Sequence, residues 1–518
     1  MRYHRTLPFF AAAVFVLHTG VPEAVQGHAP AETASPERAS TPIDRYALAA
    51  ADTFPVGTVV DSVVSVSDPT QSYALYLPSA YDPGRSWPVM YLMDPRGRAL
   101  VPMGLFREAA ERHGWILISS YDTMSDGPVE PNEIAFDAML GDTQQLFAAN
   151  LSRLYLCGFS GTARMSWPFA VNLAGHVAGM IGVGGGPPIG GAALAYPGML
   201  ETQPFSFFGA SGNTDFNYEE MLKLHAMLGN FDIPHRLVLF EGPHTWLPKD
   251  LAERGVDWLE IQAMKDGLRP VDLELVDALF TRWLEEAREL DAQGRPLAAA
   301  EAYRALVNDF VNLVPIARLT EASDRANELE RSKEVKKLIE QRKKHAEAEQ
   351  EFGKKMGDHL NELRSSEDPA RVAEKMIKDL KLEEIRRRAE TAPDTADALA
   401  AQRLIETAFT NTIFYVPRDF IDTDPERALA SLSVARAAKP ESPRVCYEEA
   451  RVNASAGHTQ EALDALECLV DTGAIRNPDF LESEDYLKRL SAEPRFAELV
   501  ERARSMAEES AAAETEGG

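Results

Sequence analysis

Residues 154–164 read LYLCGFSGTAR, and this stretch decides the fold. Its apolar first half is typical of a buried strand, and the residues that follow Gly161 are typical of a helix. Ser160 stands between them in a Gly-x-Ser-Gly turn, where small neighbours are needed because the chain bends sharply. A serine in this context predicts a nucleophile elbow, which lifts the hydroxyl above the end of a parallel sheet. Thr162 occupies the position where such a turn usually has its second glycine.

Two further polar residues follow later strands in the order that this chemistry needs. A serine hydroxyl is a poor nucleophile at neutral pH and requires a neighbouring base. Asp215 comes after the predicted strand 205–210, and His244 after the predicted strand 237–240. Because parallel strands end at one edge of a sheet, Ser160, Asp215 and His244 are expected to meet there as a catalytic triad. Taken singly, the aspartate could be a turn former and the histidine a structural residue.

Backbone donors for a developing oxyanion are expected at the same edge. Gly161 follows the nucleophile and would give the first N–H group. The second should come from the loop after the predicted strand 89–93. The proline of that loop has no N–H, so Arg96 is the first candidate and Gly97 the second. An ion pair between Asp94 and Arg96 that stiffens the loop is the alternative.

Aromatic residues close to these loops are candidate walls of a substrate pocket, namely Phe159, Phe216, Tyr218 and Trp246. The connection between the predicted strands 177–183 and 205–210 has only about 20 residues, too few for a large cap domain. We therefore expect a fairly open pocket, which suits a bulky or polymeric substrate.

The domain organisation follows from where strand patterns stop. Strand and helix patterns alternate over residues 51–268, which implies a mainly parallel sheet covered on both faces. Residues 269–420 are predicted to be helical, with long charged helices, and residues 421–508 to form tetratricopeptide-like helix pairs. Residues 509–518 are predicted to be a disordered tail. The fold class is thus α/β, followed by an all-helical region.

The N-terminus has the layout of a secretory signal peptide over residues 1–27. Arg2 and Arg5 precede an apolar run over residues 7–17, and small residues follow near a plausible cleavage point. The run is about half the ~20 residues needed to span a bilayer, although an uncleaved anchor is the alternative. Residues 28–50 are predicted to be a flexible linker. The expected location is periplasmic or secreted, without membrane attachment after cleavage.

Charge and cysteine content exclude several classes of function. The formal net charge is −27, which disfavours nucleic acid as a partner because phosphate contacts need clustered Lys and Arg. Cys157 falls in a predicted strand and is expected to be a small core residue. Cys446 and Cys468 could pair between neighbouring helices or remain free thiols. The sequence has no metal-ligand cluster or phosphate-binding loop, so neither a metal nor a cofactor is expected.

These motifs resemble the α/β-hydrolase superfamily and, within it, the exported esterases related to polyhydroxybutyrate depolymerases and feruloyl esterases. Three stretches carry the resemblance, Gly158-Phe159-Ser160-Gly161, Thr214-Asp215-Phe216-Asn217-Tyr218 and Gly242-Pro243-His244-Thr245-Trp246. It covers residues 60–265, roughly 40% of the chain. It implies Ser-His-Asp acyl transfer to water without a cofactor. The His-Gly oxyanion loop of that group is replaced here by Asp94-Pro95-Arg96-Gly97.

The expected function is hydrolysis of a small-molecule or polymeric carboxylic ester through an acyl-enzyme. One alternative is an exported serine peptidase. The other is a hydrolase scaffold without activity, whose C-terminal helices bind a protein or peptide partner, as helical-repeat grooves do.

Overall fold

The computed structural model describes residues 54–173, 175–187, 205–231 and 233–516. The predicted signal peptide and linker, and most of the connection between residues 183 and 205, lie outside these ranges.

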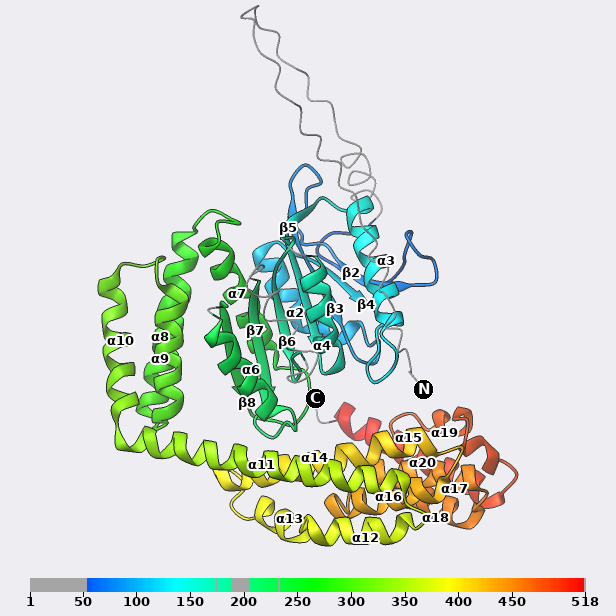
Figure 1. The fold of residues 1–518 in the computed structure, drawn as a ribbon. Coiled ribbons are helices and arrows are strands. Elements are labelled where there is room, and N and C mark those ends of the chain that lie inside the picture. The colour runs from blue at the N-terminus through cyan, green and yellow to red at the C-terminus, as the bar shows by residue number, and fades with distance from the viewer. Residues whose placement is uncertain (1–53, 174, 188–204, 232, 517–518) are drawn as a thin grey trace, which may run out of the picture. The chain divides into compact units, whose positions relative to one another are not determined.

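One eight-stranded sheet forms the first half of the described chain, in the strand order β1-β2-β4-β3-β5-β6-β7-β8 (Figure 1). β2 pairs antiparallel with both of its neighbours, and all other pairs are parallel. The predicted mainly parallel sheet is therefore confirmed. The strands are β1 (Val59–Val64), β2 (Ser72–Tyr76), β3 (Trp87–Met93), β4 (Ile116–Ser120), β5 (Ala149–Phe159), β6 (Val177–Val183), β7 (Ser206–Gly212) and β8 (His235–Phe240).

Helices cover both faces of this sheet, and neighbouring strand residues pack on opposite sides. In β3, Met90 packs in the core beneath α2 (Leu100–His113) and α7 (Lys249–Lys265). Tyr91, one residue later, packs in the opposite core, to which three helices contribute. These are α3 (Glu130–Leu146), α4 (Gly161–Asn172) and α6 (Tyr218–Asn230). Burial on both faces explains why β3 is a continuous apolar run with no alternation.

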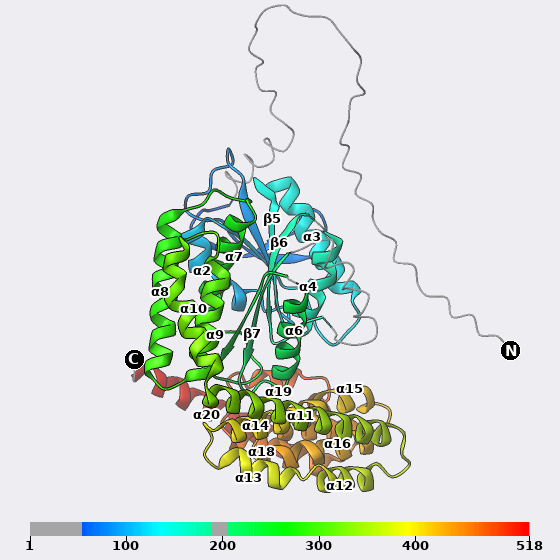
Figure 2. The same cartoon turned by 60° about the vertical axis from the view of Figure 1, so that its left-hand side comes forward.

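Three helices beyond residue 268 extend the core of the sheet domain. They are α8 (Leu273–Ala292), α9 (Pro296–Phe310) and α10 (Ile316–Arg331), which stack beside the sheet in Figure 2. Trp283 and Phe310 belong to the same hydrophobic cluster as α2 and α7. Asp309 of α9 accepts a hydrogen bond from the Trp258 indole N–H at 2.7 Å and pairs with Arg236 of β8. Packing is thus continuous across the boundary that the sequence places at residue 268.

The remaining described chain is helical. Its elements are α11 (Lys333–Ser365), α12 (Pro369–Asp379), α13 (Leu382–Glu390), α14 (Ala396–Thr410), the π-helical turn η2 (Asn411–Tyr415), α15 (Val416–Phe420), α16 (Pro425–Ala438), α17 (Pro443–Ala456), α18 (Thr459–Asp471), α19 (Asp479–Ser483), the 3₁₀ turn η3 (Leu487–Leu490) and α20 (Pro494–Glu516). The predicted all-helical region is confirmed, whereas its tetratricopeptide likeness stays a prediction. Helix α20 continues through residues predicted to be a disordered tail. Over the described ranges, no helix combines the length and apolar content needed to cross a bilayer.

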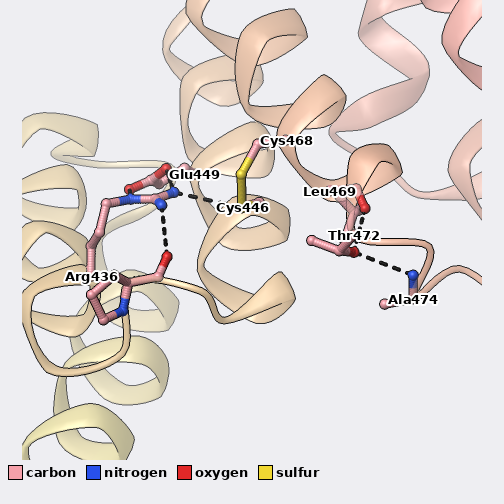
Figure 3. The surroundings of a disulfide bond; sticks show 8 residues. Arg436, Cys446, Glu449, Cys468, Leu469, Thr472 and Ala474 are labelled. Atoms are coloured by element: carbon pink, nitrogen blue, oxygen red, sulfur yellow. Dashed lines mark hydrogen bonds and ion pairs between the residues drawn. A yellow bond between two sulfur atoms is a disulfide. The ribbon is translucent and has the colours of Figure 1, made fainter.

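A disulfide joins the helix pair α17–α18 (Figure 3). It links Cys446 and Cys468, whose Cα atoms are 5.8 Å apart. Gly457 adopts a left-handed backbone (φ 78°) at the end of α17, which lets the chain reverse into α18. The structure therefore selects pairing from the two states that the sequence leaves open. Cys157 is a buried free thiol, as predicted, and burial raises its pKa well above the ordinary value.

Candidate active site

The elbow at the end of β5 holds Ser160 in a strained conformation. Its backbone angles are φ 56° and ψ −122°, a region that costs a non-glycine residue about 1–3 kcal/mol. The Ser160 N–H donates to the Val183 carbonyl at 2.8 Å, which fixes the turn against β6. A Cβ at Gly158 would lie 2.6 Å from the Ala163 nitrogen, so the turn requires glycine there.

Thr162 replaces the second glycine of the elbow without loss of packing. Its side chain is fully buried, and Oγ1 donates to the Met93 carbonyl at 2.6 Å. The same oxygen accepts the Phe159 N–H at 3.2 Å. The hydroxyl thus ties the elbow to β3, a compensation that the sequence pattern does not reveal.

The structure brings the three predicted triad residues together. Ser160 Oγ lies 2.8 Å from His244 Nε2, and His244 Nδ1 lies 2.9 Å from each carboxylate oxygen of Asp215. The Asp215 side chain is fully buried and accepts a third hydrogen bond from the Asn217 N–H at 2.7 Å. The Phe216 ring packs at 4.3 Å from the imidazole. This arrangement can pass a proton from the hydroxyl to the imidazole while the carboxylate orients the ring.

A buried carboxylate organises the loop after β3. Asp94 accepts hydrogen bonds from the Trp246 indole N–H at 2.8 Å and from the Arg98 guanidinium at 2.9 Å. Burial works to raise the pKa of Asp94, but the hydrogen bonds from Arg98 and Trp246 prevail and lower it. Arg98, and not Arg96, is therefore the ion-pair partner of this aspartate.

Asp94 also accepts hydrogen bonds from both N–H groups predicted to bind the oxyanion. The Arg96 N–H donates to Asp94 Oδ1 at 2.8 Å, and the Gly97 N–H donates to the Asp94 carbonyl at 3.2 Å. Because both groups point at Asp94, the prediction that Arg96 or Gly97 supplies the second oxyanion donor is wrong for this conformation. The physical reason is that the buried carboxylate needs N–H donors and takes that of Arg96, while the Gly97 N–H closes a tight turn onto the Asp94 carbonyl.

The loop after β4 packs against the elbow instead. A Cβ at Gly161 would lie 2.3 Å from Ser125 Cβ, so Ser125 is in direct contact with the residue after the nucleophile. Its hydroxyl donates to Asp126 Oδ2 at 2.8 Å. Asp126 has φ 60°, a second strained non-glycine residue at this site. Sequence reasoning missed Ser125, and its position in a Ser-Asp-Gly-Pro turn after a strand is the only signal that could have found it.

A cavity of about 430 Å³ adjoins Ser160. The sheet domain lines it with Met124, Ser125, Asp126, Gly127, Pro128, Asn132, Ser160, Gly161, Arg164, Met165, Phe216 and Asn217, and the helical region lines it with Thr407, Thr410, Asn411 and Tyr415. Of the four predicted wall residues, Phe216 faces the cavity. Phe159 and Trp246 pack together behind the imidazole, and Tyr218 lies beneath Arg403. The sequence predicts a fairly open pocket. In the structure, helix α14 and the turn η2 form one side of this pocket.

Three side chains of the helical region hold the loops around the site. Arg403 of α14 donates to the Asn213 carbonyl at 2.9 Å, two residues before Asp215. Arg418 donates to the Asp126 carbonyl at 2.6 Å, and the Tyr415 hydroxyl lies 3.3 Å from Asp126 Oδ1. Within the ranges that the structure describes, no group of three or more His, Cys, Asp or Glu residues could hold a metal ion.

The positions of the three triad residues along the sheet identify the fold. A mainly parallel sheet carries an elbow serine after β5, an aspartate after β7 and a histidine after β8, which is the α/β-hydrolase arrangement. An all-helical region follows it in the chain.

No protein-family model and no curated protein matches this chain. Similar solved structures include an S-formylglutathione hydrolase from Staphylococcus aureus (12% identity, TM-score 0.33, 40% of this chain and 98% of that one). A feruloyl esterase module from Clostridium thermocellum in complex with sinapinate is also similar (16% identity, TM-score 0.32, 39% and 87%). A structural study of fungal esterases from Rhizomucor miehei gives a third (13% identity, TM-score 0.32, 45% and 94%). At these identities the likeness concerns the fold alone.

Proposed function

We propose that this protein is a serine hydrolase that cleaves a carboxylic ester through an acyl-enzyme. The observation that carries the proposal is the continuous hydrogen-bonded line from Ser160 Oγ through His244 to the buried Asp215 carboxylate. His244 removes the serine proton as Oγ attacks the acyl carbonyl and returns it to the leaving alcohol. Asp215 holds the imidazole tautomer and stabilises the imidazolium. Water then attacks the acyl-enzyme with His244 as base.

The oxyanion needs two donors in this scheme. The N–H of Gly161, the first residue of α4, is the donor from the elbow. The second is the Ser125 hydroxyl, since the N–H groups of Arg96 and Gly97 are held by Asp94. Ser125 lies against Gly161, and its hydroxyl can rotate away from Asp126 when substrate binds. Each such donor is worth about 3–4 kcal/mol of the barrier.

Export to the periplasm or the medium is part of the proposal. It is supported by the charged and apolar pattern of the N-terminus and by the pairing of Cys446 with Cys468, because disulfides persist in oxidising compartments. Fractionation of expressing cells, with the mass of the mature protein, tests it. Retention in the cytoplasm at full length would contradict it.

A fluorophosphonate probe tests the enzyme directly, because it labels only an activated serine. The wild type should be labelled and Ser160→Ala should not, with ester hydrolysis lowered roughly 10⁶-fold in the variant. Ser152→Ala is the matched control, since Ser152 is an exposed serine at the other end of β5. Wild-type ester turnover by Ser160→Ala would remove Ser160 as the nucleophile. A paired assay of ester and amide substrates separates an esterase from the alternative of an exported peptidase.

A further inference from the structure

We infer, on the basis of the serine hydrolase proposed above, that helix α14 and the turn η2 form the specificity wall of the active site. This wall selects a small, uncharged substrate whose leaving group carries hydrogen-bonding groups. The helical region is then part of the catalytic unit.

The wall is a polar helix face that lines the same cavity as the nucleophile. Thr407, Asn411 and Tyr415 are spaced four residues apart and all line the cavity beside Ser160, together with Thr410. In a regular α-helix such a row drifts around the axis. The wider π-helical turn from Asn411 to Tyr415 slows this rotation, so Tyr415 stays on the cavity side. π-Helical turns of this kind occur frequently at functional sites.

The wall offers acceptor oxygens. Thr407 Oγ1 donates to the Arg403 carbonyl and Asn411 Nδ2 donates to the Thr407 carbonyl, both at 2.8 Å, which leaves the Thr407 hydroxyl oxygen and Asn411 Oδ1 to accept hydrogen bonds from a substrate. Among the described lining residues the positively charged one is Arg164, which is neutralised by Glu220, with Nη2 at 2.8 Å from Oε2; its Nη1 also donates to the Gly186 carbonyl. The negative charge in the lining, Asp126, has hydroxyl partners at its carboxylate, from Ser125 and Tyr415. Both charged residues of this lining thus have protein partners, and the acceptor oxygens of the wall favour a substrate that carries hydroxyl donors.

The volume of the cavity and its apolar residues define the size of the substrate and its acyl group. A volume of about 430 Å³ lies in the range of small-molecule pockets, which is about 300–1,000 Å³. Met124, Met165 and Phe216 supply apolar contact for a short acyl group. Arg403 and Arg418 hold the wall against the loops of Asp215 and Asp126, so it is a fixed boundary on this side of the cavity.

Two butanoate esters with three-carbon leaving groups test the inference, the glyceryl ester and the propyl ester. Wild type should prefer the glyceryl ester in kcat/KM. Asn411→Leu and Tyr415→Phe should each lower kcat/KM for the glyceryl ester about tenfold, the usual cost of one lost hydrogen bond, and leave the propyl ester within about twofold. Phe414→Leu is the matched control, because Phe414 is on the same turn, 37% exposed and outside the cavity lining.

The rate of fluorophosphonate labelling is measured on every variant, because it reports the nucleophile independently of the wall. Unchanged labelling with selective loss of the glyceryl ester supports the inference. Equal rates for both esters in wild type, or an equal loss for both in the variants, overturns it. Labelled wild type that cleaves neither ester also overturns the substrate class. If wild type is not labelled at all, it is the proposed hydrolase that fails.

Discussion

Replacing Arg403 with methionine should weaken both the helical region and the loop that carries Asp215. The guanidinium is 7% exposed and pairs with Glu349, which is 12% exposed. It also donates to the Asn213 carbonyl and stacks at 4.2 Å from the centroid of the Tyr218 ring. Methionine keeps most of the volume and removes the charge and all donors.

The magnitude follows from what the substitution leaves behind. Glu349 becomes a buried carboxylate without its partner, and breaking a buried pair in this way costs about 3–5 kcal/mol. Removing both charges, in Arg403→Met with Glu349→Leu, should recover most of that loss, because an apolar pair of similar volume is often neutral.

Activity should respond differently from stability. Asn213 also accepts the Gly242 N–H at 3.1 Å, so it lies between the loops of Asp215 and His244. Both Arg403 variants should therefore lose about tenfold in kcat through misplacement of the triad.

Urea unfolding separates the two effects. All six tryptophans lie at or before residue 283, so their fluorescence reports the sheet domain and α8, whereas circular dichroism is dominated by the helices. The single variant should shift the circular dichroism transition most, and the double variant should restore it without restoring kcat. The reasoning is refuted if Arg403→Met shifts that transition by less than about 1 kcal/mol, or if the double variant recovers full activity.

Ser125→Ala should lower kcat about 10²–10³-fold with little change in KM, since the oxyanion forms only in the transition state; an effect on KM alone would contradict its role. Replacing Cys446 and Cys468 with serine should lower the free energy of unfolding of the C-terminal helices by about 3 kcal/mol, measured by urea denaturation, because the bond closes a loop with a sequence separation of 22. Burial, followed by the charge of Glu349, raises the pKa of Glu219 to about 7 from the ordinary 4.5. Its protonated form thus stabilises the fold below about pH 4.5, and this contribution is lost as the pH rises through 7. Glu219→Gln should therefore raise the melting temperature more at pH 8 than at pH 5, and an equal shift at both pH values would contradict the assignment.

Local sequence patterns predicted the strands of the sheet domain because these strands are buried on both faces. Val177–Val183 is an uninterrupted apolar run, and the observed strand β6 has the same bounds. Ser160, Asp215 and His244 could be placed because each follows a strand whose carboxyl end lies at a known edge. The lengths of the strands were harder to predict. Strand β5 begins at Ala149, and its first residues are partly polar, so only their pairing with β3 identifies them as strand.

The second oxyanion donor and the cavity wall could not be predicted for a different reason. Whether the Arg96 N–H is free depends on the Asp94 carboxylate, which is held by Arg98 and by Trp246, the latter some 150 residues away in the chain. Thr410 and Asn411 reach Ser160 only because α11 to α14 return the chain to the sheet. No periodicity in residues 396–415 reveals which face of a helix will meet another domain.

The distribution of strain favours a working enzyme over a scaffold that has lost its activity. Among the described residues, Asn312, Lys381 and Ala392 have positive φ next to the ends of helices, where such angles are common. Ser160 and Asp126 have positive φ at the site, and Asp215 is a fully buried carboxylate. Each costs the fold free energy, about 1–3 kcal/mol for each strained residue, and all three lie around one cavity or directly behind it. A module that only bound a peptide through its helices would gain nothing from maintaining these costs in the sheet domain. It would also not need to turn the polar face of α14 and η2 toward a serine, where a peptide groove would have left that face open to a partner.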